Sequence, residues 1–228
     1  MKLVRYGAKG KELPGIIDND GKLRSLAGLV NEGSEQFLSD KGLAELGRIN
    51  LSKLPLVPGK PRFGCPVANV SKFVAIGLNY TDHAKETNSP IPKEPIIFMK
   101  ALNCLQGPND NVMLPRGSVK TDWEVELGIV IGKKTRYVTK ENALDHVAGY
   151  VLVNDVSERE FQAERGPQWD KGKGCDTFGP VGPYLVTRDE IKDPQNLELW
   201  LDVNGKRMPQ KGYITDELTE YSLDWLKE

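Results

Sequence analysis

The sequence predicts a mainly β protein of the α+β class. Short apolar runs separated by turn residues recur along the chain and predict strands at residues 73–76, 96–99, 124–131, 149–154, 184–186 and 197–203. The dipeptide Asn204-Gly205 favours a tight hairpin turn, because both residues tolerate positive φ angles. Helical periodicity is confined to residues 39–46, 79–87, 156–164 and a C-terminal stretch in which one face carries Leu218, Tyr221, Trp225 and Leu226.

The first 61 residues differ from the rest and predict a small N-terminal domain with a linker. Residues 2–6 alternate like a strand, and residues 15–26 predict a hairpin around Asp20-Gly21. Three prolines then interrupt the chain between residues 55 and 61. We therefore expect two domains, residues 1–61 and residues 62–228, with the functional residues in the second.

The composition excludes several classes of protein. The chain has 228 residues, 39% of them hydrophobic and 28% charged, so it can bury a substantial core. Its 31 basic and 32 acidic side chains leave a formal charge of −1, which offers no overall attraction to nucleic acid or to an anionic membrane. The three cysteines lack CxxC spacing and no hydrophobic leader follows Met1, so we expect reduced thiols and a cytoplasmic location.

The most informative stretch, residues 120–132, places two acids on one apolar strand. Side chains alternate along a strand, so Glu124 and Glu126 share a face. If that face is buried, the carboxylates repel and lose hydration, and Mg²⁺, Mn²⁺ or Ca²⁺ would offset both effects. The alternative is a solvated strand face with alternating charge. A third acid, Asp155, ends an apolar run and could complete such a site, or could only cap the next helix.

One histidine is placed to act as a base. His83 and Glu86 lie three residues apart in a predicted helix, where they would be neighbours. A carboxylate beside an imidazole orients it, and such a pair can take a proton from water. The alternative is a simple surface pair. We interpret the other histidine, His146, as structural.

The stretch at residues 169–180 is rich in glycine and lysine. Lys171 or Lys173 could hold an anionic oxygen of a substrate, although a solvated loop would have the same composition. The stretch lacks the Walker pattern, which argues against nucleotide binding. The chain also lacks the Gly-x-Ser-x-Gly element of serine hydrolases, and residues 109–111 are too short for an EF-hand loop.

Taken together, six motifs in order resemble those of the fumarylacetoacetate hydrolase family. They are residues 77–86 (GLNYTDHAKE), 98–100 (FMK), 107–110 (GPND), 120–132 (KTDWEVELGIVIG), 154–160 (NDVSERE) and 171–180 (KGKGCDTFGP). The resemblance extends over residues 1–208 and is closest in character to the hydrolases of 2,4-diketo acids, the acylpyruvase-like members. It implies a rolled, mixed β-sheet barrel with a small N-terminal domain, in a homodimer.

The resemblance also implies roles for the matched residues. Three acids match the Mg²⁺ or Mn²⁺ ligands of the family, namely Glu124, Glu126 and Asp155. The pair that activates water is matched by His83 and Glu86, on a segment that closes over the substrate. The remaining matches lie beside the substrate or the metal-bound oxygens, and they are Lys173, Arg159, Gln162 and Tyr80.

The implied activity is metal-dependent hydrolysis of a C–C bond in a small 2,4-dioxo, acylpyruvate-like acid. Activated water attacks the distal carbonyl while the metal stabilises the enolate. The alternatives on the same site are an oxaloacetate-type decarboxylase and an isomerase. Two alternatives without catalysis are a relative that only binds metal or an oxo acid, and an assembly element held by subunit contacts.

The C-terminus departs from the family pattern. Members continue after the hairpin at residues 204–205 through further barrel strands and a Thr-Gly-Thr-Pro loop, whereas this chain leaves the pattern near Met208 and contains no such loop. We therefore expect a barrel that is incomplete at this end. Its strand edges would be exposed unless the C-terminal helix or a partner subunit covers them.

Overall fold

The computed structural model describes residues 1–86 and 88–207, so the helix predicted near the C-terminus lies outside the described residues. The centre of the fold is a seven-stranded sheet. Its strands are β1 (Lys2–Tyr6), β2 (Leu13–Ile17), β3 (Leu23–Ser25), β6 (Leu105–Gln106), β8 (Val125–Ile131), β9 (Val147–Asn154) and β11 (Gly179–Thr187). Their order is β3-β2-β1-β11-β9-β8, and β6 pairs in parallel with β11.

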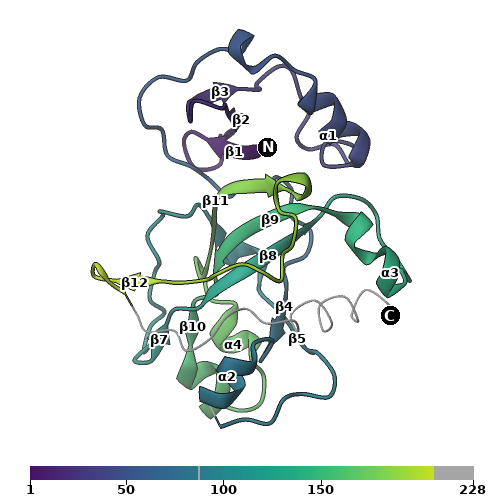
Figure 1. Cartoon of the computed structure of the whole chain (residues 1–228). Coiled ribbons are helices and arrows are strands. Elements are labelled where there is room, and N and C mark those ends of the chain that lie inside the picture. Colours follow the sequence, from purple (N-terminus) through teal and green to yellow (C-terminus); the bar gives the residue numbers. More distant parts are fainter. Residues whose placement is uncertain (87, 208–228) are drawn as a thin grey trace.

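The N-terminal strands extend this sheet. The predicted hairpin is confirmed as β2 and β3, and β1 pairs antiparallel with both β2 and β11. One hydrophobic core joins residues 1–61 to the rest of the chain, since Leu3, Ile16 and Leu26 cluster with Val151 and Leu185. Figure 1 shows β1–β3 on one side of β11, β9 and β8, and the short elements β4, β5, β7, β10, α2 and α4 on the other.

Shorter elements surround the sheet. The strand pairs are β4 (Val74–Gly77) with β5 (Ile96–Met99), β7 (Thr121–Asp122) with β10 (Ser157–Glu158), and β12 (Asp202–Val203) with β13 (Lys206–Arg207). The α-helices are α1 (Asp40–Gly47), α2 (Thr81–Glu86), α3 (Lys140–Ala143) and α4 (Asp170–Lys173). The other helical turns are η1 (Leu51–Lys53), η2 (Leu102–Cys104), η3 (Leu144–His146), η4 (Glu160–Glu164) and η5 (Arg188–Glu190). Within the described part of the chain, no helix has the length and apolarity needed to span a membrane.

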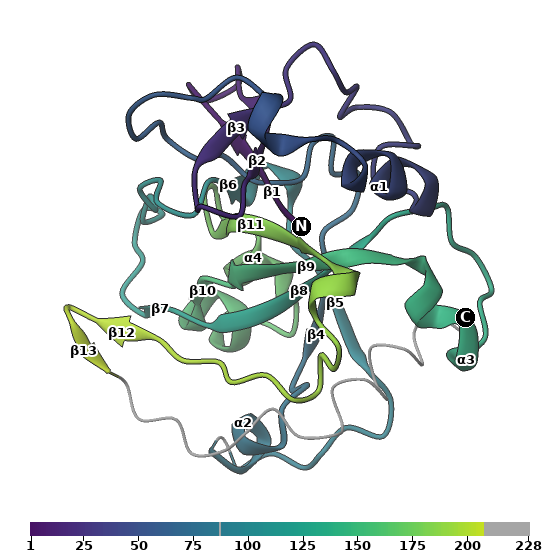
Figure 2. The ribbon, with the colours of Figure 1, turned by 45° about the horizontal axis from the view of Figure 1, so that its top comes forward.

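Two local expectations are wrong. The helix expected at residues 156–164 is instead β10 followed by a π-helical turn, η4. The strand expected at residues 197–203 forms only at β12, because residues 197–201 have no neighbouring strand in the described structure to pair with. The Asn204-Gly205 turn itself is confirmed, and Figure 2 shows its hairpin projecting from the body of the protein.

The mainly β, α+β class is confirmed, but the barrel is not closed. In residues 1–86 and 88–207 the large sheet ends at β3 on one side and at β8 on the other. The outer edge of β8 therefore carries unpaired main-chain groups within this range, as the sequence led us to expect at an incomplete barrel.

An ion-pair network ties the N-terminal segment, residues 1–61, to residues that follow it in the chain. Arg62 donates from Nε to Asp110 Oδ1 at 2.6 Å and from its NH1 group to Glu12 Oε1 at 2.7 Å. The hydrogen bond from Arg62 holds the pKa of Asp110 below its ordinary value. The contribution of Asp110 to stability is therefore complete above its ordinary pKa and is lost as the pH falls through the lower value in the folded protein.

We predict that Arg62→Met lowers the free energy of unfolding by about 1.5–3 kcal/mol at pH 7, because three hydrogen bonds to carboxylates are lost. The difference from the unsubstituted protein should shrink below about pH 4, as its Asp110 takes up a proton. Urea unfolding at pH 7 and at low pH measures both effects. Lys22→Met is the control, since its ion pair with Asp20 is exposed; an equal effect of both changes at pH 7 would contradict the prediction.

Candidate active site

Two acidic residues meet where β8 and β9 pair. The antiparallel register places Val125 opposite Asn154, so the residues just outside the strands, Glu124 and Asp155, become neighbours. The main-chain N–H of Asp155 donates to the main-chain oxygen of Glu124 at 2.9 Å, which extends the ladder by one bond. Residues that are 31 positions apart in the sequence therefore present their carboxylates side by side.

Lys173 bridges these two carboxylates. Its Nζ lies 2.7 Å from Glu124 Oε2 and 2.9 Å from Asp155 Oδ2, and its side chain is 3% exposed. The residue ends α4, which packs against β10, β5 and η4. The ammonium group also lies 5.1 Å from the centre of the Phe98 ring, which in turn packs against Trp169. Of the two lysines considered in this stretch, the structure therefore brings Lys173 to the acids.

A second buried lysine completes the cluster, and the sequence analysis missed it as a site residue. Lys100 follows β5, its side chain is fully buried, and its Nζ lies 2.5 Å from Asp155 Oδ1. It also donates to the main-chain oxygens of Lys173 at 2.5 Å and Val156 at 3.3 Å. Lys100 stood in one of the family motifs, but no sequence pattern indicates which lysine will be buried against an acid.

Glu126 lies next to this cluster, and no ion pair to it occurs among the residues that the structure describes. Burial, and after it the charges of Glu124 and Asp155, raise the pKa of Glu126 to about 8. The residue as a whole is only partly buried, so this effect comes from the protein packed around the carboxyl group. The nearest polar groups belong to the segment before α2, since Asn79 Nδ2 lies 3.5 Å from Glu126 Oε2.

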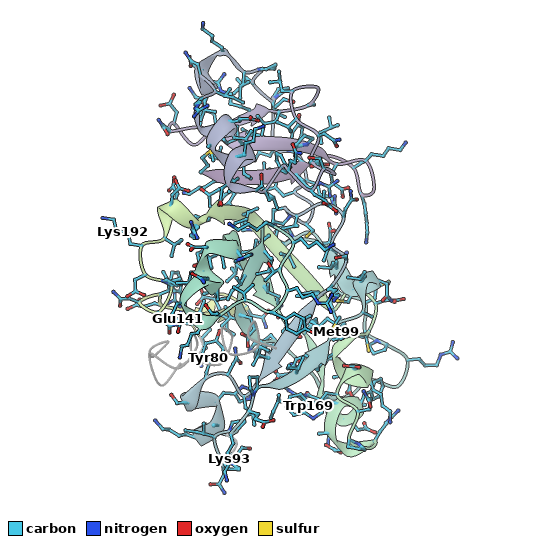
Figure 3. All side chains as sticks on the ribbon, turned by 90° about the vertical axis from the view of Figure 1, so that its right-hand side faces the viewer. Tyr80, Lys93, Met99, Glu141, Trp169 and Lys192 are labelled. Carbon is cyan, nitrogen blue, oxygen red and sulfur yellow. The ribbon has the colours of Figure 1, made fainter. Side chains whose placement is uncertain are left out.

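Tyr80 is enclosed beside Glu126. Its hydroxyl group is buried without a hydrogen-bond partner of good geometry among the described residues. Burial, and then the charge of Glu126, raise the pKa of Tyr80 well above its ordinary value. Figure 3 shows Tyr80, Met99 and Trp169 in the half of the molecule away from the N-terminal strands.

Arg159 and Gln162 border the cluster from the segment that follows β10. The Arg159 NH1 group donates to Glu124 Oε1 at 2.5 Å and to Gln162 Oε1 at 3.2 Å. Its Nε and NH2 groups both donate to Asp122 Oδ2, which fixes the plane of the guanidinium. Two of the three residues that the family resemblance assigns to substrate binding, Arg159 and Gln162, therefore lie beside the acidic cluster, as does the third, Tyr80.

The predicted water-activating pair lies on α2, directly after the Asn79-Tyr80 segment that reaches Glu126. His83 and Glu86 are three residues apart on this helix, but the side chain of Glu86 lies outside the described structure, so their pairing stays a prediction. His146 Nδ1 lies 3.0 Å from the Thr135 hydroxyl group at the far end of β8 and β9, in agreement with a structural role.

The cluster has the donor chemistry of a site for a hard divalent cation. Two carboxylates, Glu124 and Asp155, pair with two ammonium groups, and the buried carboxyl group of Glu126 beside them has no ion pair among the described residues. Asp155 Oδ1 has no hydrogen bond of good geometry in the same part of the chain. As they stand, however, no three His, Cys, Asp or Glu side chains of the described residues are arranged to hold a metal ion. The ammonium group of Lys173 bridges two of the three predicted ligands, so metal binding would require it to shift.

Comparisons with known proteins identify the family. Residues 72–220 match the family described as "Fumarylacetoacetate (FAA) hydrolase C-terminal". The chain belongs to the fumarylacetoacetate hydrolase family. A protein of Burkholderia lata, named as a presumed hydrolase without a substrate, is 59% identical over 207 residues, which are 91% of this chain and 73% of that protein.

Solved structures of the fumarylacetoacetate hydrolase family extend the likeness over the whole chain. The fumarylacetoacetate hydrolase of Exiguobacterium antarcticum is 30% identical, with a TM-score of 0.78 over 100% of this chain and 80% of that chain. The maleylpyruvate hydrolase of Sphingobium sp. SYK-6, in complex with manganese(II) and pyruvate, is 26% identical, with a TM-score of 0.79 over 100% and 83%. A 5-carboxymethyl-2-hydroxymuconate delta-isomerase of Mycobacterium smegmatis is 28% identical, with a TM-score of 0.72 over 100% and 80%.

We predict that Glu126 makes the metal-free protein less stable as the pH rises. Its carboxyl group keeps a proton to about pH 8 in the folded chain but ionises near pH 4.5 when unfolded, so the folded state binds more protons between these values and stability falls with rising pH. Glu126→Gln should lack this part of the pH dependence. Urea unfolding after chelator treatment at pH 5, 6.5 and 8 measures it.

The control for this experiment is Glu45→Gln, because Glu45 is an exposed carboxylate on α1. The control should follow the unsubstituted protein at every pH. An identical pH dependence in Glu126→Gln and in the unsubstituted protein would show that Glu126 is not protonated in the folded state.

Proposed function

We propose that this protein is a Mg²⁺- or Mn²⁺-dependent hydrolase that cleaves a C–C bond in a small 2,4-dioxo, acylpyruvate-like acid. The observation that carries the proposal is the convergence of Glu124 and Asp155 on the buried ammonium group of Lys173, with Glu126 beside them. The family neighbour with manganese(II) and pyruvate supports both the type of metal and the type of ligand. We further propose, from the resemblance alone, a cytoplasmic homodimer.

The carboxylates Glu124, Glu126 and Asp155 would hold the metal. The bound ion would supply positive charge beside the carboxylate and the 2-oxo group of the substrate, where negative charge develops as the bond breaks. The displaced ammonium group of Lys173 would then be free to hold a substrate oxygen. Its low exposure strengthens such a contact, because the site contains little water to screen it.

The polar side chains around the cluster would orient the acid. Arg159 and Gln162 are already hydrogen-bonded to each other, so they can act as one unit in holding the substrate. Tyr80 has a buried hydroxyl group beside Glu126 that makes no hydrogen bond of good geometry among the described residues, and this group could donate to a substrate oxygen. The Arg159–Gln162 unit and Tyr80 come from two different segments of the chain, and contacts from two sides fix the orientation of a small ligand.

His83, assisted by Glu86, would act as the base. It takes a proton from water, and the resulting hydroxide adds to the 4-oxo carbon of the substrate. The bond between C3 and C4 then breaks, C4 leaves as a carboxylic acid, and the electron pair of the bond passes to C3 and the 2-oxo group. The proton held by His83 returns to C3, which gives a 2-oxo acid.

A second candidate reaction is isomerisation of an unsaturated 2-oxo acid, because one solved structure of the family belongs to a delta-isomerase. Decarboxylation of oxaloacetate uses the same contacts with the 2-oxo acid. In neither reaction is water added to a carbonyl group, so neither requires His83 to activate water. The products therefore separate the three reactions, as does the effect of changing His83.

We expect Mg²⁺- or Mn²⁺-dependent release of pyruvate and acetate from acetylpyruvate. Glu124→Gln should weaken Mn²⁺ binding at least about tenfold and abolish turnover, since a ligand is lost. His83→Ala should lower kcat by about 10²- to 10⁴-fold and leave Mn²⁺ binding within twofold. Assays on acetylpyruvate, oxaloacetate and an unsaturated 2-oxo acid, with calorimetry for Mn²⁺, measure these effects.

Glu45→Gln is again the matched control, because it removes an exposed carboxylate far from the cluster. Full metal-dependent activity in Glu124→Gln would refute the proposal. Binding of Mn²⁺ and oxalate without turnover of any of the three acids would assign the protein to the non-catalytic alternative.

A further inference from the structure

We infer that Lys100 is a positioning residue of the proposed metal site, which it serves by fixing Asp155 and the main chain of Lys173. The inference rests on the proposed function, since it concerns how the carboxylates are held for a cation. Lys100 has no exposed side-chain surface, so it cannot touch a substrate or the solvent. Any role it has must act through the groups that its ammonium contacts.

The first of these groups is Asp155. One carboxylate oxygen, Oδ1, lies 2.5 Å from Lys100 Nζ, and the other, Oδ2, lies 2.9 Å from Lys173 Nζ. Lys100 therefore leaves Oδ2 facing Glu124 and the interior of the cluster. A carboxylate held at one oxygen has lost most of its rotational freedom before a cation binds.

The second group is the C-terminal end of α4. The last carbonyl groups of a helix have no partner within the helix, and Lys100 donates to the main-chain oxygen of the final residue, Lys173, at 2.5 Å. It also donates to the main-chain oxygen of Val156, which directly follows Asp155. One ammonium group therefore joins the end of β9 to the end of α4.

The position of Lys100 is itself fixed. Its main-chain N–H donates to the Phe73 oxygen at 2.9 Å, where the chain enters β4, so the β4–β5 pair holds the backbone of Lys100. The β4–β5 pair, the β8–β9 pair and α4 thus meet at this single side chain. A purely structural lysine would serve the same packing, so the test needs a measurement that packing alone does not change.

That measurement is the affinity of the chelator-treated protein for Mn²⁺, and the sign of the change is decisive. Loss of a positive charge close to a cation site would by itself strengthen cation binding. Loss of the position of Asp155 would weaken it, and changes to residues that orient a metal ligand typically weaken binding about 10- to 100-fold. We expect Lys100→Met, which keeps the length of the side chain, to bind Mn²⁺ at least about tenfold more weakly.

Lys100→Gln is a second variant that keeps the proposal testable if Lys100→Met does not fold. Its amide can still donate a hydrogen bond to a main-chain oxygen, but it carries no charge for Asp155. It should also bind Mn²⁺ at least about tenfold more weakly. Arg62→Met is the matched control, since it removes a partly buried cation from a distant ion-pair network and should leave Mn²⁺ binding within twofold. Circular dichroism and thermal unfolding without metal check that each variant is folded.

The outcomes separate the two proposals. Folded Lys100 variants that bind Mn²⁺ as tightly as the unsubstituted protein, or more tightly, would overturn the positioning role and leave the proposed function intact. An unsubstituted protein that binds no Mn²⁺ would overturn both. Weaker binding in the Lys100 variants, with unchanged binding in Arg62→Met, would support the inference.

Discussion

The interaction on which the site depends is a buried group of opposite charges, in which Lys100 and Lys173 pair with Glu124 and Asp155. Removing a single charge from water costs several kcal/mol, and Lys100 and Lys173 are both almost completely removed from it. Each ammonium group is tolerated because Asp155 forms an ion pair with both of them, one at each oxygen. The elements that carry these residues must consequently keep their relative positions, because a shift that separated an ammonium group from its carboxylate would leave a buried charge without a partner.

The central sheet provides the rigid base for that constraint. β9 lies between β11 and β8, and β11 lies between β9 and β1, so the strand that delivers Asp155 is paired on both sides. The N-terminal strands contribute to the site only indirectly, through the core that they share with β9 and β11. The geometry of the site should therefore depend on the N-terminal strands, because they stabilise β9 and β11.

Local prediction failed where a buried polar contact overrode sequence periodicity. Residues 156–164 have helical spacing, yet the buried carboxylate of Glu158 accepts main-chain N–H groups from Lys120 and Phe161, each at 2.7 Å. These bonds hold β10 against β7 and delay the helical turn until Glu160. The sequence showed the acid, but not the loop at residues 118–120 that would satisfy it.

The sequence by itself determined the mainly β class, the hairpins at Asp20-Gly21 and Asn204-Gly205, and the position of acids at strand-forming segments, because turn chemistry and alternation are local properties. It also carried the six motifs of the fumarylacetoacetate hydrolase family. Residue spacing left Lys171 and Lys173 open and the family resemblance favoured Lys173, but only the tertiary structure decided that Lys173 bridges Glu124 and Asp155 and that Lys100 is buried against Asp155. Lysine has the same local preferences in solvent and in a core, so its burial depends on which distant carboxylate the folded chain brings to it.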